Sequence, residues 1–249
     1  MKNICISLIL FFLSCDMSAQ PWFDVGIKTS YNSSWLINQN VIKDPAVSYI
    51  PSYGYMGGIK LGYNFNSQHE LNTEFLYSSV NQKYQDNLSS EDWLRNINLT
   101  YFEIPLLYRH NNNGSYAEAG PQFSALMSAR ESSWSNNNAN VNNYFQSSDV
   151  SGVFGFGAAI AGVNNTSIML GVRIVYGFLD ITSSRGGKDQ PYPYPAYPGY
   201  FNNASSATLY KATNTLSGGF VLEINYDLGY FVTSSCKRNT KFLLFNRKD

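Results

Sequence analysis

The feature that most constrains this chain is an alternation of side-chain type with a period of two, which recurs along most of its length. It is clearest at residues 53–65, where the odd positions carry Tyr, Ile, Leu and Phe around a single Gly57. The even positions of this segment carry Gly, Met, Asn and a single Lys60. Because successive side chains of a β-strand point to opposite faces, the segment predicts a strand with one apolar, aromatic face and one face of mainly small residues.

Seven other segments follow the same pattern, so the sequence predicts eight strands. These segments are residues 22–32, 69–81, 99–110, 115–128, 151–163, 167–180 and 216–230. The links at 66–68, 111–114 and 164–165 are short and rich in Asn, whereas the links between the other pairs are much longer. An even strand count with short and long links in strict alternation is typical of one fold, an all-β, eight-stranded antiparallel up-and-down transmembrane β-barrel.

The chemistry of the two faces favours a membrane barrel over a soluble β-sandwich or a lipocalin-like barrel. The second face is mostly Gly, Ala and Ser with isolated charges, which suits a crowded lumen, and the apolar face suits lipid. Charged residues make up 14% of the chain, compared with roughly 25% in soluble domains. The net charge of zero gives no basic surface for nucleic acid. No internal apolar run reaches the length of about 18 residues that a membrane-spanning helix needs.

The N-terminus has the three parts of a secretory signal peptide. Lys2 supplies the positive region, residues 4–13 form an apolar stretch, and small residues precede a cleavage site after Ala19. We therefore expect a signal peptide at residues 1–19 and export to the cell outer membrane. Cys15 leaves a lipoprotein signal open as an alternative.

Three motifs carry a resemblance to a known family. Residues 101–108 read Tyr-Phe-Glu-Ile-Pro-Leu-Leu-Tyr, residues 116–121 read Tyr-Ala-Glu-Ala-Gly-Pro, and residues 18–20 read Ser-Ala-Gln. These motifs resemble those of the PorT-like outer-membrane β-barrel family of Bacteroidota. The resemblance implies an eight-stranded barrel in the outer membrane and no particular activity. One branch of the family serves in protein secretion and gliding, so a component of such an apparatus, with envelope proteins as partners, is an alternative function.

The same resemblance predicts where the last strand of the barrel ends. Barrels of this kind usually end at an aromatic residue, which Tyr226, Tyr230 or Phe231 would supply here. The predicted barrel therefore covers residues 20–231. Residues 232–249 form a basic C-terminal periplasmic tail with five bases and one acid. The tail is either frayed or in contact with anionic inner-leaflet lipid or a periplasmic partner.

Both signs of charge occur on the face assigned to the lumen. Besides Asp24, the charged positions are Lys28, Lys60, Glu74, Glu103, Arg109, Glu118, Arg173 and Glu223. A buried charge is costly unless it is paired, so we expect an ion-pair network in which Arg173 and Lys60 meet several carboxylates. Those carboxylates are Glu103, Glu118 and Glu223. The alternative is an ion pathway or gate, but eight strands leave an interior just wide enough for side chains.

The sequence gives little indication of an enzyme, a cofactor or a metal site. His69 and His110 both lie beside predicted short turns, and neither belongs to a recognisable nucleophile motif. No Cys/His spacing for zinc, phosphate-binding glycine loop or calcium loop is present. We therefore expect a non-enzymatic protein that binds outer-membrane lipid and needs no cofactor.

The long loops are the best candidates for function. Residues 190–201 alternate Pro with aromatic residues, and a stiff extended backbone of this kind presents tyrosines at low entropic cost. The candidate contact residues are Tyr192, Tyr194, Tyr197, Tyr200 and Phe201. They would stack on glycans or hold a protein partner, or else the loop packs rigidly over the barrel mouth.

Overall fold

Five segments of the chain are described by the computed structural model. They are residues 21–43, 47–87, 95–133, 138–186 and 210–230. The predicted signal peptide, the candidate contact loop at 190–201 and the basic tail lie outside these described residues. Within the described segments, no helix has both the length and the apolar character that crossing a bilayer requires.

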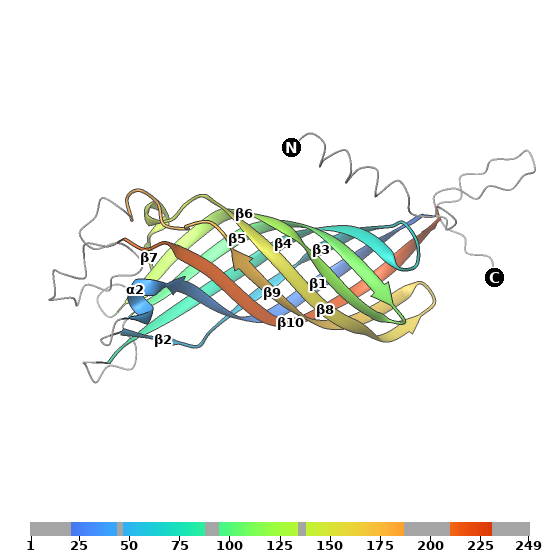
Figure 1. The fold of residues 1–249 in the computed structure, drawn as a ribbon, viewed down its shortest axis with the longest axis horizontal. Coiled ribbons are helices and arrows are strands. Elements are labelled where there is room, and N and C mark those ends of the chain that lie inside the picture. The colour runs from blue at the N-terminus through green and yellow to red at the C-terminus, as the bar shows by residue number, and fades with distance from the viewer. Residues whose placement is uncertain (1–20, 44–46, 88–94, 134–137, 187–209, 231–249) are drawn as a thin grey trace, which may run out of the picture.

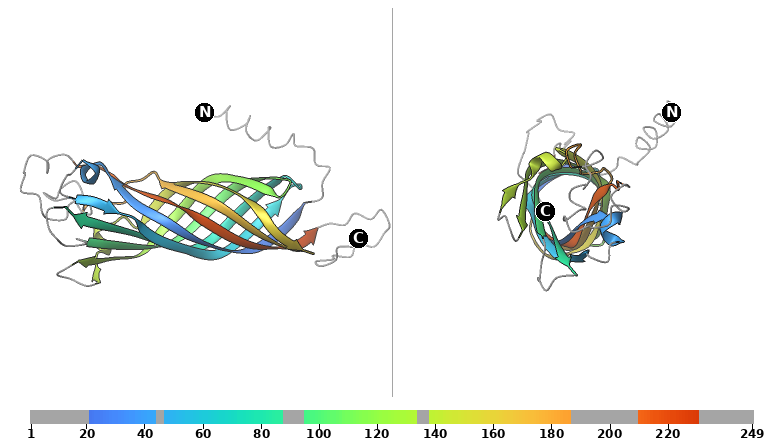
Figure 2. Two further views of the ribbon diagram at one scale, coloured as in Figure 1. Left: turned by 90° about the horizontal axis from the view of Figure 1, so that it is seen from below. Right: turned by 90° about the vertical axis from the view of Figure 1, so that its left-hand side faces the viewer.

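Eight long strands form a closed ring, as the sequence predicted (Figures 1 and 2). They are β1 (Trp22–Asn38), β3 (Ser52–Asn64), β4 (His69–Asp86), β5 (Arg95–Asn112), β6 (Ser115–Ser133), β8 (Ser148–Val163), β9 (Thr166–Gly177) and β10 (Thr213–Tyr230). Each strand pairs antiparallel with the neighbour that follows it along this order. The ring closes where β1 pairs with β10, from Trp22 opposite Tyr230 to Asn38 opposite Thr213. The fold is therefore an eight-stranded antiparallel up-and-down β-barrel.

The two ends of the barrel differ. The short turns lie at one end, where β1 also begins and β10 ends, and the longer connections lie at the other end (Figure 1). The turn between β5 and β6 uses Asn113 and Gly114, both with positive φ, which is the backbone of a tight hairpin. Short elements of secondary structure lie at the long-loop end. They are α2 (Gln39–Ile42), β2 (Val47–Ile50), β7 (Ala139–Asn140) and the 3-10 helix η1 (Asn142–Tyr144).

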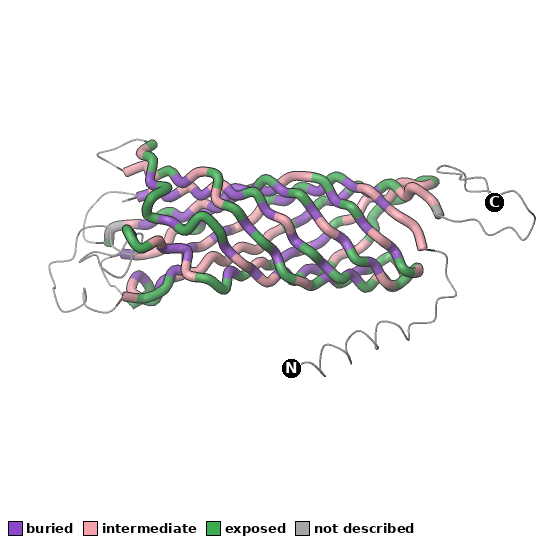
Figure 3. Tube along the Cα trace, turned by 90° about the horizontal axis from the view of Figure 1, so that it is seen from above, coloured by how far each residue is buried: buried purple, intermediate pink, exposed green. Residues whose placement is uncertain are grey.

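The outer surface of the barrel is apolar over a broad band. Burial alternates residue by residue along the strands (Figure 3). Large apolar side chains such as Ile27 and Phe220 are 65% and 68% exposed. Aromatic rings gather toward the ends of this surface, where Tyr31 stacks on Tyr53 with ring centres 5.5 Å apart. This distribution fits a hydrocarbon band with interfacial aromatic girdles.

Several strands continue further toward the long-loop end than the sequence pattern predicted. Both β4 and β5 have 18 residues, whereas a tilted transmembrane strand needs about 9–11. Toward the long-loop end of β4 the polarity is reversed, because Lys83 is exposed while Val80 and Tyr84 are 9% and 2% exposed. The outward-facing side chains of the strand therefore change from apolar ones, which suit lipid, to polar ones, which suit water. The prediction ended these strands early because it followed only the first pattern.

An apolar cluster fills the interior of this extended part. Its buried members are Leu36, Val41, Val47, Val80, Tyr84, Ile97, Leu99, Tyr101, Ala129, Val141, Phe145 and Ile181. Five of these come from the connections rather than from the barrel strands or β7, namely Val41, Val47, Val141, Phe145 and Ile181. The described bases of three long loops thus fold inward and close the barrel mouth with an ordinary hydrophobic core.

Two adjacent glycines of β3 differ in the space around them. A Cβ at Gly58 would lie 2.0 Å from the carbonyl oxygen of Phe75 on β4, whereas a Cβ at Gly57 would meet nothing closer than 4.0 Å. We expect Gly58→Ala to lower the free energy of unfolding by about 1–3 kcal/mol through overpacking. Gly57→Ala should be neutral or slightly stabilising, because it restricts only the unfolded chain.

The temperature at which the SDS-resistant barrel loses its compact gel mobility measures this difference, since closed barrels pair all strand edges and resist SDS until heated. Equal transition temperatures for the two alanine variants would contradict the close approach of β3 and β4 at Gly58.

Candidate functional site: the barrel interior

A network of charged side chains fills the lumen at the level of the apolar band. Seven of the eight barrel strands contribute to it, and β8 contributes Gly155, whose missing Cβ leaves room for Glu118. The bases are Lys28, Lys60, Arg109 and Arg173, and the acids are Asp24, Glu70, Glu74, Glu118 and Glu223. None of the nine residues is more than 5% exposed. Removing so many charges from water requires close pairing of every one.

Arg173 on β9 joins two glutamates. Its Nη1 lies 2.7 Å from Oε2 of Glu74 on β4, and its Nη2 lies 2.8 Å from Oε1 of the same carboxylate. The Nε and Nη2 groups of Arg173 also donate to Oε1 of Glu118 on β6. The planar guanidinium can bind two carboxylates at once, each through two N–H groups, which a lysine cannot do.

Arg109 on β5 makes a second bidentate ion pair. Its Nη1 and Nη2 each lie 2.7 Å from one carboxylate oxygen of Glu223 on β10. Its Nη2 also lies 2.7 Å from Oε2 of Glu118, so Glu118 bridges the two arginines. The Arg109 guanidinium stacks over the ring of Tyr116 at 4.3 Å from the ring centre, which adds a cation–π contact.

The two lysines extend the network across the closing seam of the barrel. Lys28 on β1 lies 2.8 Å from Glu223 and also pairs with Glu74. Lys60 on β3 lies 2.6 Å from Glu70 and 3.1 Å from Glu223. Glu223 therefore meets three bases, and Glu118 likewise meets Lys28, Arg109 and Arg173.

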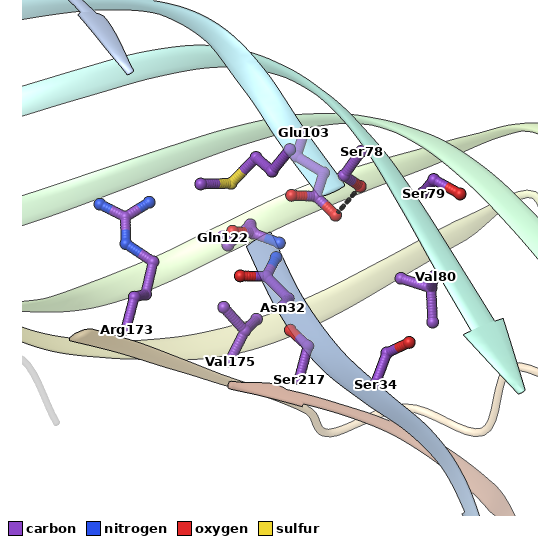
Figure 4. Close-up of a pocket in the computed structure, with 11 residues that line it drawn as sticks. Asn32, Ser34, Ser78, Ser79, Val80, Glu103, Gln122, Arg173, Val175 and Ser217 are labelled. Carbon is purple, nitrogen blue, oxygen red and sulfur yellow. Dashed lines mark hydrogen bonds between the residues drawn. The ribbon is translucent and has the colours of Figure 1, made fainter. Parts of the chain in front are cut away.

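A small polar cavity lies between the network and the apolar cluster (Figure 4). It is lined by Glu103, Gln122, Arg173, Ser78 and Ser217, among others. The space open to the centres of water molecules is about 20 Å³, which is enough for about one water. This cavity therefore has room for about one water molecule between the charged network and the apolar cluster.

The family of the chain follows from a comparison of its sequence with known families. A family model described as an outer membrane protein beta-barrel domain matches residues 18–183. The chain belongs to this outer membrane β-barrel family. The family places the barrel in outer-membrane lipid, in agreement with the apolar band.

Solved outer membrane proteins are similar to this outer membrane barrel in fold. Neisserial surface protein A is 13% identical, with a TM-score of 0.43 over 82% of this chain and 96% of that chain. Ail of Yersinia pestis is 14% identical, with a TM-score of 0.39 over 83% and 99% of the two chains. OprG of Pseudomonas aeruginosa is 13% identical, with a TM-score of 0.37 over 84% and 96%. No curated protein matches the chain.

The structure brings seven of the eight predicted lumen residues of this outer membrane barrel into one network. The exception is Glu103, which the sequence analysis expected to pair with a base. It lies nearer the long loops, where it accepts a hydrogen bond at 2.5 Å from Ser78 and makes no ion pair within the described residues. The alternation shows which face a residue occupies but not its height along the barrel.

One member of the network was missed by the sequence analysis. Glu70 lies in the predicted strand 69–81 but was not among the predicted lumen charges. It shares that face with Glu74 and lies next to the short turn, at the first positions of β4. The signal was therefore present in the alternation. Among the described residues there is no group of three or more His, Cys, Asp or Glu side chains suited to a metal ion.

Two glutamates provide a matched test of the network. Glu223→Gln removes a charge that meets three buried bases, and breaking such a buried pair costs about 3–5 kcal/mol. Glu103→Gln keeps an acceptor for Ser78 and should cost under about 1 kcal/mol. Guanidinium unfolding of the barrel in lipid vesicles, followed by tryptophan fluorescence, measures both. Similar midpoints for the two variants would show that the network does not hold the barrel together.

Proposed function

We propose that this chain is a non-enzymatic, non-conducting outer membrane protein whose extracellular loops contact or bind a partner outside the cell. The observation that carries the proposal is the filled interior. Nine buried charges pair across the lumen, and an apolar cluster fills the long-loop end of the barrel above them. An eight-stranded barrel has no room for a channel beside such side chains.

The long-loop end supports the second half of the proposal. Its strands extend past the length that a bilayer requires, so the loops start well above the lipid surface. The described bases of the loops are anchored by Val141, Phe145 and Ile181 in the apolar cluster. The described residues on either side of the segment 187–209 lie at this end, where the backbone N–H of Gly186 donates to the carbonyl of Ser183 and the Tyr210 hydroxyl donates to Asp180. Functional loops held by a rigid scaffold are a common arrangement in binding proteins.

The positions of the titratable groups support a non-enzymatic role. The lumen carboxylates of the network are paired with bases, and His69 and His110 lie at the short-turn end, far from the loops. A role in a secretion apparatus rests only on the resemblance carried by residues 18–20, 101–108 and 116–121, and we do not propose it here.

Conductance in planar bilayers tests the filled lumen. We expect the purified barrel to insert without producing channel steps, because the charges of the lumen are tied to one another rather than to water. Unit conductance steps that change in size in Arg173→Ala would favour the pore alternative. Heat-dependent gel mobility of the same preparation provides the control that the inserted barrel is closed.

The contact loop is tested by removing its aromatic side chains while keeping its length. The variant replaces five residues with Ser, namely Tyr192, Tyr194, Tyr197, Tyr200 and Phe201. We expect the barrel in nanodiscs to bind members of a printed glycan array through ring stacking, and the variant to lose at least tenfold in affinity. Replacing Tyr144, which is exposed on η1, with Ser gives a matched control. Equal glycan signals from the loop variant and from the unmodified barrel would contradict glycan binding by this loop.

A further inference from the structure

The only two histidines of the 249-residue chain are brought together by the fold. His69 begins β4 and His110 lies near the end of β5, directly opposite it in the register of the two strands. The centres of the two imidazole rings are 5.2 Å apart. Both side chains project from the outer surface at the short-turn end, where His69 is half-buried and His110 is exposed.

This ring separation fits a shared metal ion. An ion bound at about 2.1 Å from an imidazole nitrogen lies about 3.2 Å from the centre of that ring. Two rings that meet the ion at the tetrahedral angle then have centres about 5.2 Å apart, as observed. Rings that meet it at a right angle, as in a square-planar site, would have centres about 4.5 Å apart. We propose that His69 and His110 form a Zn²⁺ site at the periplasmic rim of the barrel, independent of the function proposed for the loops.

A neighbouring tyrosine prepares one of the two ligands. The hydroxyl of Tyr108, on the same face of β5, lies 2.5 Å from Nδ1 of His69. In the tautomer that donates its Nδ1 proton to this hydroxyl, the lone pair of His69 is on Nε2, the atom left for the metal. Zinc-bound histidines commonly make a hydrogen bond through their second ring nitrogen, which fixes the ring and its tautomer. Tyr108 is therefore a positioning residue for His69.

The surroundings leave the ion open to further ligands. The site adjoins the turn at residues 65–68 and the turn at 113–114, and the backbone N–H of Asn111 donates to the carbonyl of Gln68 at 2.7 Å to hold the two turns together. Two protein imidazoles fill half of a tetrahedral shell, so water or a ligand from a periplasmic partner completes it. Bound zinc would tie β4 to β5 where the barrel faces the periplasm.

Zinc binding by the untagged mature chain in detergent micelles tests the site. Equilibrium dialysis against free Zn²⁺ is carried out with Cys236 replaced by Ser in every protein, so that no thiol contributes. We expect saturation at one ion per barrel, a loss of at least tenfold in affinity in His69→Gln and in His110→Gln, and no change in Gln68→Ala. Binding that is equal in the unmodified barrel and in the double His→Gln variant would overturn the proposal.

Nuclear magnetic resonance gives a second, direct measurement, because a chain with two histidines gives two sets of imidazole signals. Both sets should shift together over the same range of Zn²⁺ concentration, and a response of only one imidazole would overturn the shared site. Tyr108→Phe should weaken zinc binding by about tenfold while the heat-dependent gel mobility stays unchanged. Unchanged zinc affinity in this variant would overturn the positioning role of Tyr108.

Discussion

The structure depends on the absence of water from the hydrocarbon layer. Main-chain groups in that layer have no solvent to bond with, so each strand must pair on both sides and the sheet must close. Closure of eight strands leaves a lumen with room for side chains alone. The charged groups that enter it must therefore find partners of opposite charge inside. The bidentate ion pairs of Arg109 with Glu223 and of Arg173 with Glu74 meet this requirement.

The same constraint explains why the interior changes along the barrel. Within the lipid, apolar side chains such as Phe220 belong outside, and charged ones belong inside. Above the lipid, polar side chains face water. Val80, Leu99 and Ile181 there help to form an apolar interior like that of a soluble protein. One continuous sheet thus carries two opposite patterns. The loops can be anchored only in the second of these, because only there does the barrel offer an apolar core.

The sequence predicted well those parts of the strands in which one face is apolar and the other carries small or charged side chains. Lipid on one side and a crowded lumen on the other impose a period of two, so the eight strands and the inward position of Lys28 were readable. The ends of the strands near the long loops were missed because the apolar side chains there face inward and the polar ones face outward. The pairing of Glu103 was wrong because height along the barrel depends on tilt and register, which alternation does not encode. The meeting of His69 and His110 depends on register as well.

Strand register also explains why charged side chains in the lumen are useful to the barrel. Since replacing buried ion pairs with apolar residues is often neutral or stabilising, stability alone does not explain nine buried charges. A strand that is apolar on both faces, however, would pair equally well after a slip of one residue. With Lys28, Arg109 or Glu223 on one face, the same slip would move a charge from its partners into lipid, at a cost of several kcal/mol. The network therefore selects one register and one inward face for each strand, and filling the lumen is the consequence of that selection.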